Sequence, residues 1–512
     1  MPLKSLLFSL LAISGPLAAQ SPPKEIDAAV GQALKRFNQP GVAIAVVKDG
    51  KVVFQQGWGV RRLGESARVD AHTRFQVASN TKAMTAAAIA ILVADGKLKW
   101  DVPVANYLPW FRLGGDPYVS RELTVRDLLC HRSGLSLGAG DLLWFHSDYS
   151  SAEIARRLQF IAPATSFRSS YAYDNVLYIV AGELIKEVSG MPWGEFVTHR
   201  ILEPIGMSET VTNLTAIAAG ENLASPHGTL GGPMQVVPFD SVDNIEAAGG
   251  VVSSVADWSR WMLTQLDSGR IAGTTVWPSA QTRELWSPGI PVPIGDPPPP
   301  LLPLRPNFSA YGLGWSLRDY RGVKLVTHDG GLAGMLSRTI LVPEKRLGIV
   351  IFTNGETLTY QALGWTVLDY YLGAPRTDWT SIIATLGEQA QSTDRAFEDS
   401  IQAARHAEIG PSLPLTRLAG RYTDEWYGDV TLALEGDHLV LHWSHSPALV
   451  ADLEHWQYDT FRARMRTPNV ADAFLTFQLK YDGTVDRITM APVLPSTDFS
   501  FNYQDLVFRP GE

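Results

Sequence analysis

The chain of 512 residues has a single cysteine, Cys130, and this scarcity excludes several classes of protein. One thiol cannot form an intrachain disulfide and cannot supply a thiolate metal cluster. The sequence also lacks the HExxH pattern of metalloproteases and the GxxxxGK[ST] pattern of phosphate-binding loops. Acidic residues outnumber basic ones, 52 to 43, and a net charge of -9 is unfavourable for binding nucleic acid. We therefore expect no metal, no cofactor and no nucleic-acid partner.

Long apolar runs are also rare. The clearest, residues 6–13, follows Lys4 and precedes the small-residue stretch PLAAQ. A positive start, a short apolar core and a small-residue cleavage site are the pattern of a secretory signal peptide, with cleavage predicted after Ala19. The run is too short to span a bilayer comfortably, and an uncleaved anchor is the alternative. We expect an exported protein, periplasmic or secreted, with no stable membrane insertion.

Strand patterns flank a helical middle. Residues 41–60 are interpreted as two strands joined by a turn at Asp49-Gly50, and strand patterns return over residues 311–356. From about residue 100 to 270 the pattern is mainly helical. This order predicts an α/β (α+β) fold in which one antiparallel sheet, assembled from both ends, is flanked by helices and carries an inserted helical region.

Helices in this middle part are predicted to start near Thr124, Asn175 and Ser254, because these side chains suit the first position of a helix. The proline-dense segment at residues 287–308 cannot continue a helix or an inner strand. We interpret it as a loop at the rim, with a substrate-gating loop as the alternative.

The pattern changes again after residue 373. Residues 374–414 are predicted to form a charged helical linker, and residues 415–512 a separate small antiparallel β-barrel-like domain with a hairpin turn at Asp482-Gly483. The predicted organisation is therefore a signal peptide (1–19), a main domain (20–373), the linker and the barrel.

The barrel-like segment is rich in aromatic and histidine residues. The aromatics Trp426, Tyr427, Trp443, Trp456 and Tyr458 are expected to be core residues, although a small barrel can also hold a ligand. The histidines at positions 438, 442 and 445 suggest a metal site only weakly, since on a strand only the first two share a face.

The stretch FQVASNTKAMTAAAIAILVADG places Ser79 three residues before Lys82 at the start of a helical run. Two side chains at this spacing lie on one face of a helix. A serine hydroxyl becomes a nucleophile when a base takes its proton, and a lysine amine can do so when burial lowers its pKa. A solvated lysine is the alternative, but the surrounding alanine and isoleucine residues leave hardly any exposed face. We predict a nucleophile and its base.

Further elements follow downstream. Tyr173 and Asn175 form a Tyr-x-Asn just before a predicted helix, and His328, Gly330 and Gly331 lie in the sequence HDGG at the end of a predicted strand. Taken alone, the first two would be interpreted as a buried tyrosine and a helix cap, and His328 as a structural residue. His131, in LLCHRSGL, is expected to pack or cap a helix end, and Cys130 to behave as a small buried hydrophobe.

With Ser79 and Lys82, these elements occur in an order that resembles the serine β-lactamase and penicillin-recognising enzyme family. The chain is most similar to its class C-type branch of D-aminopeptidase-like peptidases and esterases. The segments LTVRDLLCHRSGL, LEPIGMSET, AAGGVVSSVADWSRWM and YGLGWSL extend the resemblance over residues 24–372. The C-terminal part, with HWQYDTF, resembles the lipocalin-like domain of some of these peptidases.

The resemblance implies roles for the residues. Ser79 would form the acyl-enzyme, and Lys82 and Tyr173 would transfer protons, either being able to act as the base. Asn175 would hydrogen-bond Lys82 or a substrate amide. The backbone N–H groups of Ser79 and Gly331 would form an oxyanion hole.

One departure from the family pattern affects the expected substrate. β-Lactamases usually carry Lys-Thr-Gly where this chain has His328, Asp329 and Gly330. A histidine there has only a conditional charge, and it resembles the aminopeptidase and esterase side of the family. We predict a hydrolase of small peptides, including those with D- or other non-standard residues. A carboxylesterase, a β-lactamase and a non-enzymatic ligand-binding protein are the alternatives, and self-association into a homo-oligomer is compatible with the sequence.

Overall fold

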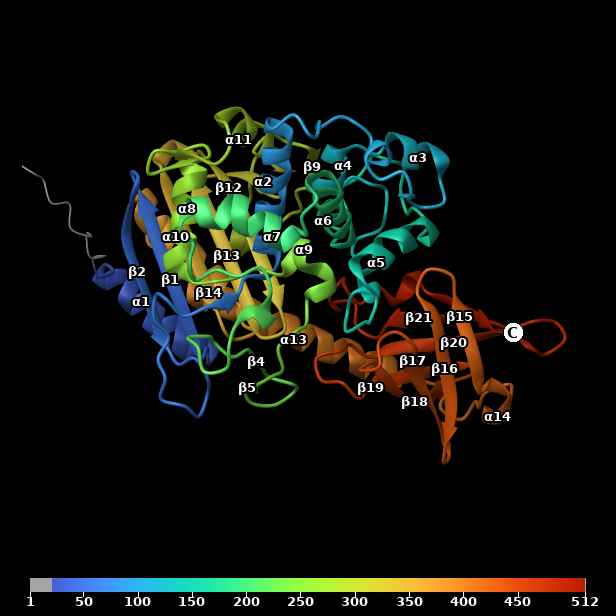
Figure 1. Cartoon of the computed structure of the whole chain (residues 1–512). Coiled ribbons are helices and arrows are strands. Elements are labelled where there is room, and N and C mark those ends of the chain that lie inside the picture. The colour runs from blue at the N-terminus through green and yellow to red at the C-terminus, as the bar shows by residue number, and fades with distance from the viewer. Residues whose placement is uncertain (1–20, 512) are drawn as a thin grey trace, which may run out of the picture.

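The structure is a computed structural model that describes residues 21–511. Its larger part, here called the sheet domain, is built on an eight-stranded sheet with the order β2-β1-β14-β13-β12-β11-β10-β9. Strands β1 (Gly41–Lys48) and β2 (Lys51–Gly59) come from the start of the chain, and β1 pairs antiparallel with β14 (Leu347–Thr353). The predicted antiparallel sheet assembled from two distant segments is confirmed, as is the hairpin at Asp49-Gly50 (Figure 1).

The side chains of β1 alternate between two cores. Val42, Ile44 and Val46 pack in a cluster with α1 (Lys24–Phe37) and α12 (Thr359–Leu372). The intervening alanines and Val47 belong to the other cluster, which contains α2 (Thr81–Ala94) and α10 (Val255–Leu266). Because strand side chains point to opposite faces in turn, a strand covered by helices on both faces is apolar at every position.

The remaining strands of the sheet come from the later part of the domain. They are β9 (Ile290–Pro291), β10 (Ser309–Tyr311), β11 (Ser316–Tyr320), β12 (Val323–Leu332) and β13 (Met335–Val342). The proline-dense segment is more regular than predicted, because it contributes β9 and a 3₁₀ helix, η8 (Pro299–Leu304). Pro291 is tolerated because β9 is the edge strand, where a missing N–H leaves no inner partner unpaired.

The inserted region between β2 and β9 is mainly helical, as predicted. It includes α3 (Pro117–Glu122), α4 (Val125–Leu129), α5 (Ser151–Arg157), α6 (Val176–Ser189), α7 (Trp193–Val197), α8 (Glu203–Ile205), α9 (Glu246–Gly249) and α11 (Ser279–Leu285), besides α2 and α10. Three two-stranded ribbons accompany them: β3 (Phe75–Gln76) with β6 (Val252–Ser253), β4 (His227–Gly228) with β5 (Gln235–Val236), and β7 (Arg270–Ile271) with β8 (Thr274–Thr275). The first ribbon matters most, because the turn that carries Ser79 follows it.

A long helix, α13 (Trp379–Ala403), leads from the sheet domain towards a closed eight-stranded barrel (Figure 1). A short helix, α14 (Leu415–Leu418), lies between α13 and the first barrel strand. The barrel strands are β15 (Gly420–Asp424), β16 (Gly428–Glu435), β17 (His438–Trp443), β18 (Val450–Gln457), β19 (Thr460–Met465), β20 (Ala473–Leu479), β21 (Val485–Pro492) and β22 (Val507–Pro510). The predicted C-terminal barrel is therefore confirmed. Lipocalin likeness and the domain boundaries stay predictions.

Four of the five aromatic residues expected in the barrel core are buried, and one is not. Tyr458 is 47% exposed, in the turn between β18 and β19 with a φ of 48°. The prediction for Tyr458 was wrong because aromatic content alone does not separate a strand position from a turn. His438 and His442 pair with Asp452 and Glu435. Among residues 21–511, no group of three or more His, Cys, Asp or Glu side chains is arranged to hold a metal ion.

The barrel is docked on the sheet domain by direct hydrogen bonds. The Tyr149 hydroxyl donates to the carbonyl of Tyr427 at 2.6 Å, and Arg157 donates to the carbonyl of Trp426 at 3.0 Å. The ring of His445 stacks on Tyr149 with centroids 4.0 Å apart. These contacts place the barrel against α5 and the segment before it (Figure 1).

The predicted signal peptide, residues 1–19, lies outside the described residues. Within the described part of the chain, no helix combines the length and the hydropathy needed to cross a membrane.

Candidate active site

Ser79 lies in a 3₁₀ turn, η1 (Ala78–Asn80), immediately before α2. Three features characterise this turn. The β3–β6 ribbon precedes it, and Ala78 adopts a φ of 48°, a conformation that is unfavourable for a residue with a side chain. The Asn80 side chain donates to the hydroxyl of Ser337 on β13 at 2.8 Å. Ser79 is thus held at a sharp, strained position rather than within a regular helix.

Lys82, one turn later, has no exposed surface. Its amine donates to Ser79 Oγ at 3.0 Å, to Asn175 Oδ1 at 2.7 Å and to the carbonyl of Ala248 at 3.0 Å. Every residue from Thr81 to Leu92 is buried, which excludes the solvated-lysine interpretation. Burial lowers the pKa of Lys82 to about 7, although the charge of Asp141 opposes the shift. The amine is therefore available in its neutral form near neutral pH.

Asn175 stands at the first position of α6 but does not cap the helix with its side chain. Instead its Oδ1 accepts from Lys82, and its Nδ2 donates to Asp141 Oδ2 at 2.8 Å. The cap predicted at this position is wrong, because the side chain turns inward to the lysine. Caps at Thr124 and Ser254 are confirmed.

Asp141 is a buried residue that the sequence analysis missed. Its carboxylate accepts from Trp144 Nε1 at 2.9 Å and from Ser500 Oγ at 2.8 Å, besides Asn175. Burial raises the pKa of Asp141 to about 6, against these hydrogen bonds and the charge of Lys82. No local pattern in GAGDLLW marks this aspartate as part of a site, because its partners are distant in sequence.

Tyr173 lies beside both Ser79 and Lys82. Its ring centroid is 4.9 Å from Lys82 Nζ, and burial raises the pKa of the Tyr173 hydroxyl well above its usual value, against a hydrogen bond with Ser79. His131 packs against this ring, with centroids 4.3 Å apart, and accepts from the backbone N–H of Asp174 at 3.1 Å. His131 therefore packs as predicted, but against the tyrosine of the site.

His328 is buried near Tyr173, with ring centroids 6.4 Å apart. Its Nδ1 lies 2.6 Å from the carbonyl of Asp329, which can only accept, so Nδ1 carries the proton. The Nε2 atom then accepts from the hydroxyl of Tyr311 at 2.8 Å. Burial and the nearby Lys82 lower the pKa of His328 to about 3. The conditional charge expected at this position is therefore wrong, because the ring stays neutral near pH 7. Tyr311 was missed as an individual residue, although its segment carried the family resemblance.

The two glycines after Asp329 line the approach to Ser79. A Cβ on Gly330 would lie 2.2 Å from the carbonyl of Val77 and 3.1 Å from the backbone nitrogen of Ser79. Only glycine allows β12 to pass this close to the turn that carries Ser79. Gly331 follows and faces the cavity. The structure thus brings all seven predicted site residues together.

The site opens into a cavity of about 600 Å³. Its lining includes Ser79, Tyr173, Asn175 and the glycines of β12. The cavity is also lined by Asp498, Phe499 and Ser500, which belong to the loop between β21 and β22 (residues 493–506) of the barrel. The barrel therefore forms part of the wall of the candidate active site.

Known proteins are similar to this chain in sequence or in fold. Unguisins hydrolase ungD of Aspergillus violaceofuscus (strain CBS 115571) is 30% identical to this chain over 468 residues, covering 85% of this chain and 81% of the relative. The octameric penicillin-binding protein homologue from Pyrococcus abyssi superposes with a TM-score of 0.59 at 20% identity, covering 95% of this chain and 99% of its own. A D-stereospecific amidohydrolase from Streptomyces sp. gives a TM-score of 0.51 at 24% identity over 64% of this chain and 94% of its own.

Family models divide the chain into two matching parts. Residues 404–510 match a model described as a domain of unknown function (DUF3471). Residues 26–371, which contain the sheet, the inserted helices and the Ser79–Lys82 pair, match the model described as Beta-lactamase. A match of this extent, over the residues that build the site, shows that the chain belongs to the beta-lactamase family of serine hydrolases.

Proposed function

We propose that the protein is an exported peptidase or amidase that hydrolyses small peptides through an acyl-enzyme on Ser79. The observation that carries the proposal is the buried amine of Lys82, 3.0 Å from Ser79 Oγ. A lysine with a pKa of about 7 is matched to accepting a proton at neutral pH. Nothing in packing requires a buried lysine with this set of partners, whereas acyl transfer does.

The electrostatics favour Lys82 over Tyr173 as the base. Burial keeps the Tyr173 hydroxyl protonated, while it favours the neutral amine of Lys82. In the proposed acylation, Lys82 Nζ takes the Ser79 proton as Oγ attacks the carbonyl carbon. The oxyanion forms towards the backbone N–H groups of Ser79 and Gly331. Tyr173 relays a proton to the departing amine and is reprotonated through Lys82. Water then attacks the acyl carbon and restores Ser79.

The names of similar proteins support amide bonds as the substrate. One relative is called a hydrolase of unguisins, and one structural neighbour is called a D-stereospecific amidohydrolase. A carboxylesterase would use the same residues on an easier bond. A β-lactamase is less well supported, because the neutral His328 offers no cation to a substrate carboxylate.

Export and self-association belong to the same proposal. The pattern of residues 1–19 supports export, and the octameric state named for the Pyrococcus abyssi neighbour supports a test of oligomer formation. The size of the exported protein in solution would check the second point.

The test begins with covalent labelling of Ser79 by a fluorophosphonate, with Ser79→Ala as the blank. Hydrolysis is then measured on a matched panel: D- and L-aminoacyl anilides, a short peptide, short-chain p-nitrophenyl esters and a chromogenic cephalosporin. We expect labelling at Ser79 and turnover of anilides or peptide. The D/L ratio reports whether the cavity distinguishes chirality.

The other outcomes are equally informative. Turnover of esters alone would change the assignment to an esterase, and rapid turnover of the cephalosporin would restore the β-lactamase alternative. Folded protein that cannot be labelled at Ser79 would contradict an enzyme, and would favour the ligand-binding alternative.

A further inference from the structure

We propose that the barrel supplies a positioning residue, Ser500, whose hydroxyl holds Asp141 and thereby adjusts the proton affinity of Lys82. This inference rests on the proposed function and deepens it, because it makes the docked barrel part of the proton-transfer apparatus. It concerns a residue that lies outside the segment matched by the beta-lactamase family model.

A continuous chain of hydrogen bonds connects Ser500 to the nucleophile. Ser500 Oγ donates to Asp141 Oδ2 at 2.8 Å, and Asn175 Nδ2 donates to the same oxygen at 2.8 Å. Asn175 Oδ1 accepts from Lys82 at 2.7 Å, and Lys82 donates to Ser79 at 3.0 Å. One hydroxyl of the barrel therefore lies three hydrogen bonds from Lys82.

The loop that carries Ser500 is held rigidly on both sides. The Ser500 N–H donates to Asp498 Oδ1 at 2.9 Å, which closes a tight turn. The next residue, Phe501, packs edge-on against Phe145 of the sheet domain, with centroids 5.3 Å apart, and stacks on Tyr503 of its own loop. The turn and the packing of Phe501 therefore fix the position of the Ser500 hydroxyl.

The sheet domain provides a matching surface for this loop. A Cβ on Gly138 would lie 2.3 Å from the carbonyl of Phe499, so only glycine allows the loop to come this close. Phe499 packs edge-on against the ring of Tyr173, with centroids 5.8 Å apart. Two neighbouring residues of the barrel thus contact two members of the site, Tyr173 and the Asp141 network.

Asp141 is the charged group that raises the pKa of Lys82. The other titratable side chains that face this pair are Tyr173, Tyr178, His131, His328 and Asp174. Burial raises the pKa values of the two tyrosines and lowers those of the two histidines, so these four side chains are neutral near pH 7, and burial also raises the pKa of Asp174. Asp141 is the anion that stabilises the Lys82 cation.

Removing the Ser500 hydroxyl should therefore act on Lys82 in a definite direction. The Ser500 hydrogen bond favours the ionised form of Asp141, so its loss raises the pKa of Asp141. A less ionised Asp141 stabilises the Lys82 cation less, and the pKa of Lys82 falls. The rising limb of acylation against pH then moves to lower pH, and the plateau is lower because the amine is a weaker base.

The experiment measures the rate constant of fluorophosphonate labelling at Ser79 from pH 5 to 9, using the full-length protein. We expect Ser500→Ala to shift the apparent pKa of the rising limb down by about 0.5 to 1 unit, and to reduce the plateau roughly 2- to 5-fold. Ser500→Thr, which keeps the hydroxyl, should restore the original limb.

Ser136→Ala is the matched control. Ser136 Oγ donates to Asp505 Oδ2 at 2.9 Å, so it is another serine hydroxyl at the interface of the same loop but lies outside the Asp141 network. We expect its pH profile to coincide with that of the unmodified protein. Thermal unfolding of each variant shows that the compared proteins are folded.

The results separate this inference from the proposed function. If the unmodified protein labels at Ser79 and the limb of Ser500→Ala does not move, the role of Ser500 is refuted and the hydrolase stands. An equal shift in Ser136→Ala, or a Thr variant that behaves like Ala, also refutes it, because docking alone would then explain the effect. If no variant labels, the proposed function itself fails.

Discussion

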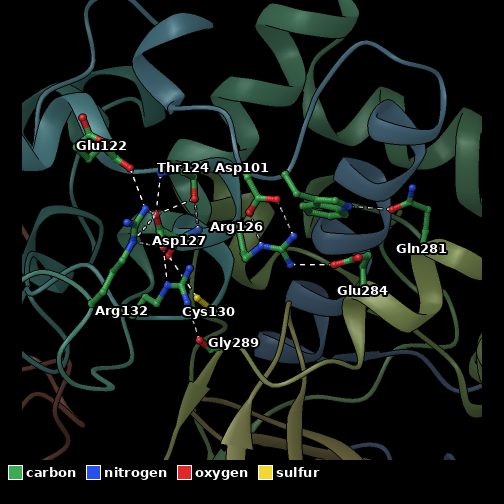
Figure 2. A network of polar contacts seen from close by, with 12 residues as sticks. Asp101, Glu122, Thr124, Arg126, Asp127, Cys130, Arg132, Gln281, Glu284 and Gly289 are labelled. Carbon is green, nitrogen blue, oxygen red and sulfur yellow. Dashed lines mark hydrogen bonds and ion pairs between the residues drawn. The ribbon is translucent and has the colours of Figure 1, made fainter.

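Two buried aspartates of the inserted helical region, Asp127 and Asp141, have opposite pKa shifts because their hydrogen-bond partners differ. Both are fully buried. Asp127 contacts two arginines directly, Arg132 Nε at 2.5 Å and Arg168 Nη2 at 2.6 Å, and it also accepts from the backbone N–H of Thr124 at 2.8 Å (Figure 2). Burial opposes its ionisation, but the hydrogen bonds from Arg168 and Thr124 outweigh burial and hold the pKa of Asp127 below its usual value.

The Asp141 carboxylate, by contrast, accepts hydrogen bonds from three neutral donors. They are the indole of Trp144, the amide of Asn175 and the hydroxyl of Ser500. The nearest cation, Lys82, is reached only through Asn175. Burial therefore prevails and raises the pKa of Asp141 to about 6.

The difference separates a structural ion cluster from the site that we propose for proton transfer. Direct contact with two guanidinium groups fixes a charge over the whole physiological pH range, which suits a scaffold. Indirect contact through Asn175 leaves Asp141 and Lys82 with pKa values of about 6 and 7. Because these values are close, a small change in the surroundings of either group changes which of the two carries a proton. The comparison predicts that mutations in the first cluster change stability, whereas mutations in the second change the chemistry.

The largest expected effect is that of Lys82→Met, which removes the buried amine and keeps most of its volume. We expect labelling of Ser79 to fall by about 1000-fold, because Tyr173, the other group beside Ser79, is kept protonated by burial and is a poor base. The labelling rates of Lys82→Met and of the unmodified protein are compared, and near-normal labelling of the variant would contradict the assignment of the base.

The same variant tests the electrostatics through stability. The folded-state pKa of Lys82, about 7, lies below that of an unfolded lysine, so the folded protein binds fewer protons between about pH 7 and 10 and its stability rises with pH there. Lys82→Met lacks this increase. The difference in the free energy of unfolding, variant minus unmodified protein, should therefore have its highest value near pH 7 and should decrease towards pH 10.

The second effect concerns the structural cluster. Asp127→Asn leaves the two partly exposed arginines without their shared anion, and the loss of hydrogen bonds to a charged group costs about 1.5 to 3 kcal/mol of stability. We expect a large fall in the melting temperature, while molecules that remain folded still label at Ser79. Chemical unfolding combined with labelling at 25 °C separates the two quantities.

Asp101→Asn provides the control for Asp127→Asn. Asp101 belongs to the neighbouring ion pair with Arg126, but its side chain is 75% exposed (Figure 2). An exposed pair contributes little, so the change in stability should stay within about 0.5 kcal/mol. A loss as large as that of Asp127→Asn would show that burial is not what distinguishes the two carboxylates.

The fold and the proximity of Ser79 and Lys82 were predictable from sequence because their signals are local. The Asp49-Gly50 turn, the apolar surroundings of Lys82 and the caps at Thr124 and Ser254 all depend on neighbours in the chain. Asn175 shows the limit of such reasoning. It stands where a cap is expected, yet its side chain bonds Lys82, which is 93 residues away.

The contacts that complete the site could not be predicted, because they join distant segments. Asp141 and Ser500 are 359 residues apart and belong to different parts of the molecule. The neutral state of His328 depends equally on distant packing, because burial and the nearby Lys82 set its pKa. Sequence patterns describe which chemistry is present, whereas the tertiary structure sets the charge state of each group.

The smallest expected effect compares two hydroxyl groups that serve the two aspartates. Thr124 Oγ1 donates to Asp127 Oδ2 at 2.7 Å and accepts from the Asp127 N–H in a capping box at the start of α4. We expect Thr124→Ala to lower stability by about 1 kcal/mol, since the cap is lost. The labelling profile against pH should not move, because two arginines still hold the Asp127 charge. Thr124→Ser, which keeps the hydroxyl, should retain most of the stability. If Thr124→Ala shifted the pH profile as Ser500→Ala is expected to do, the separation between scaffold charge and reactive charge would be lost.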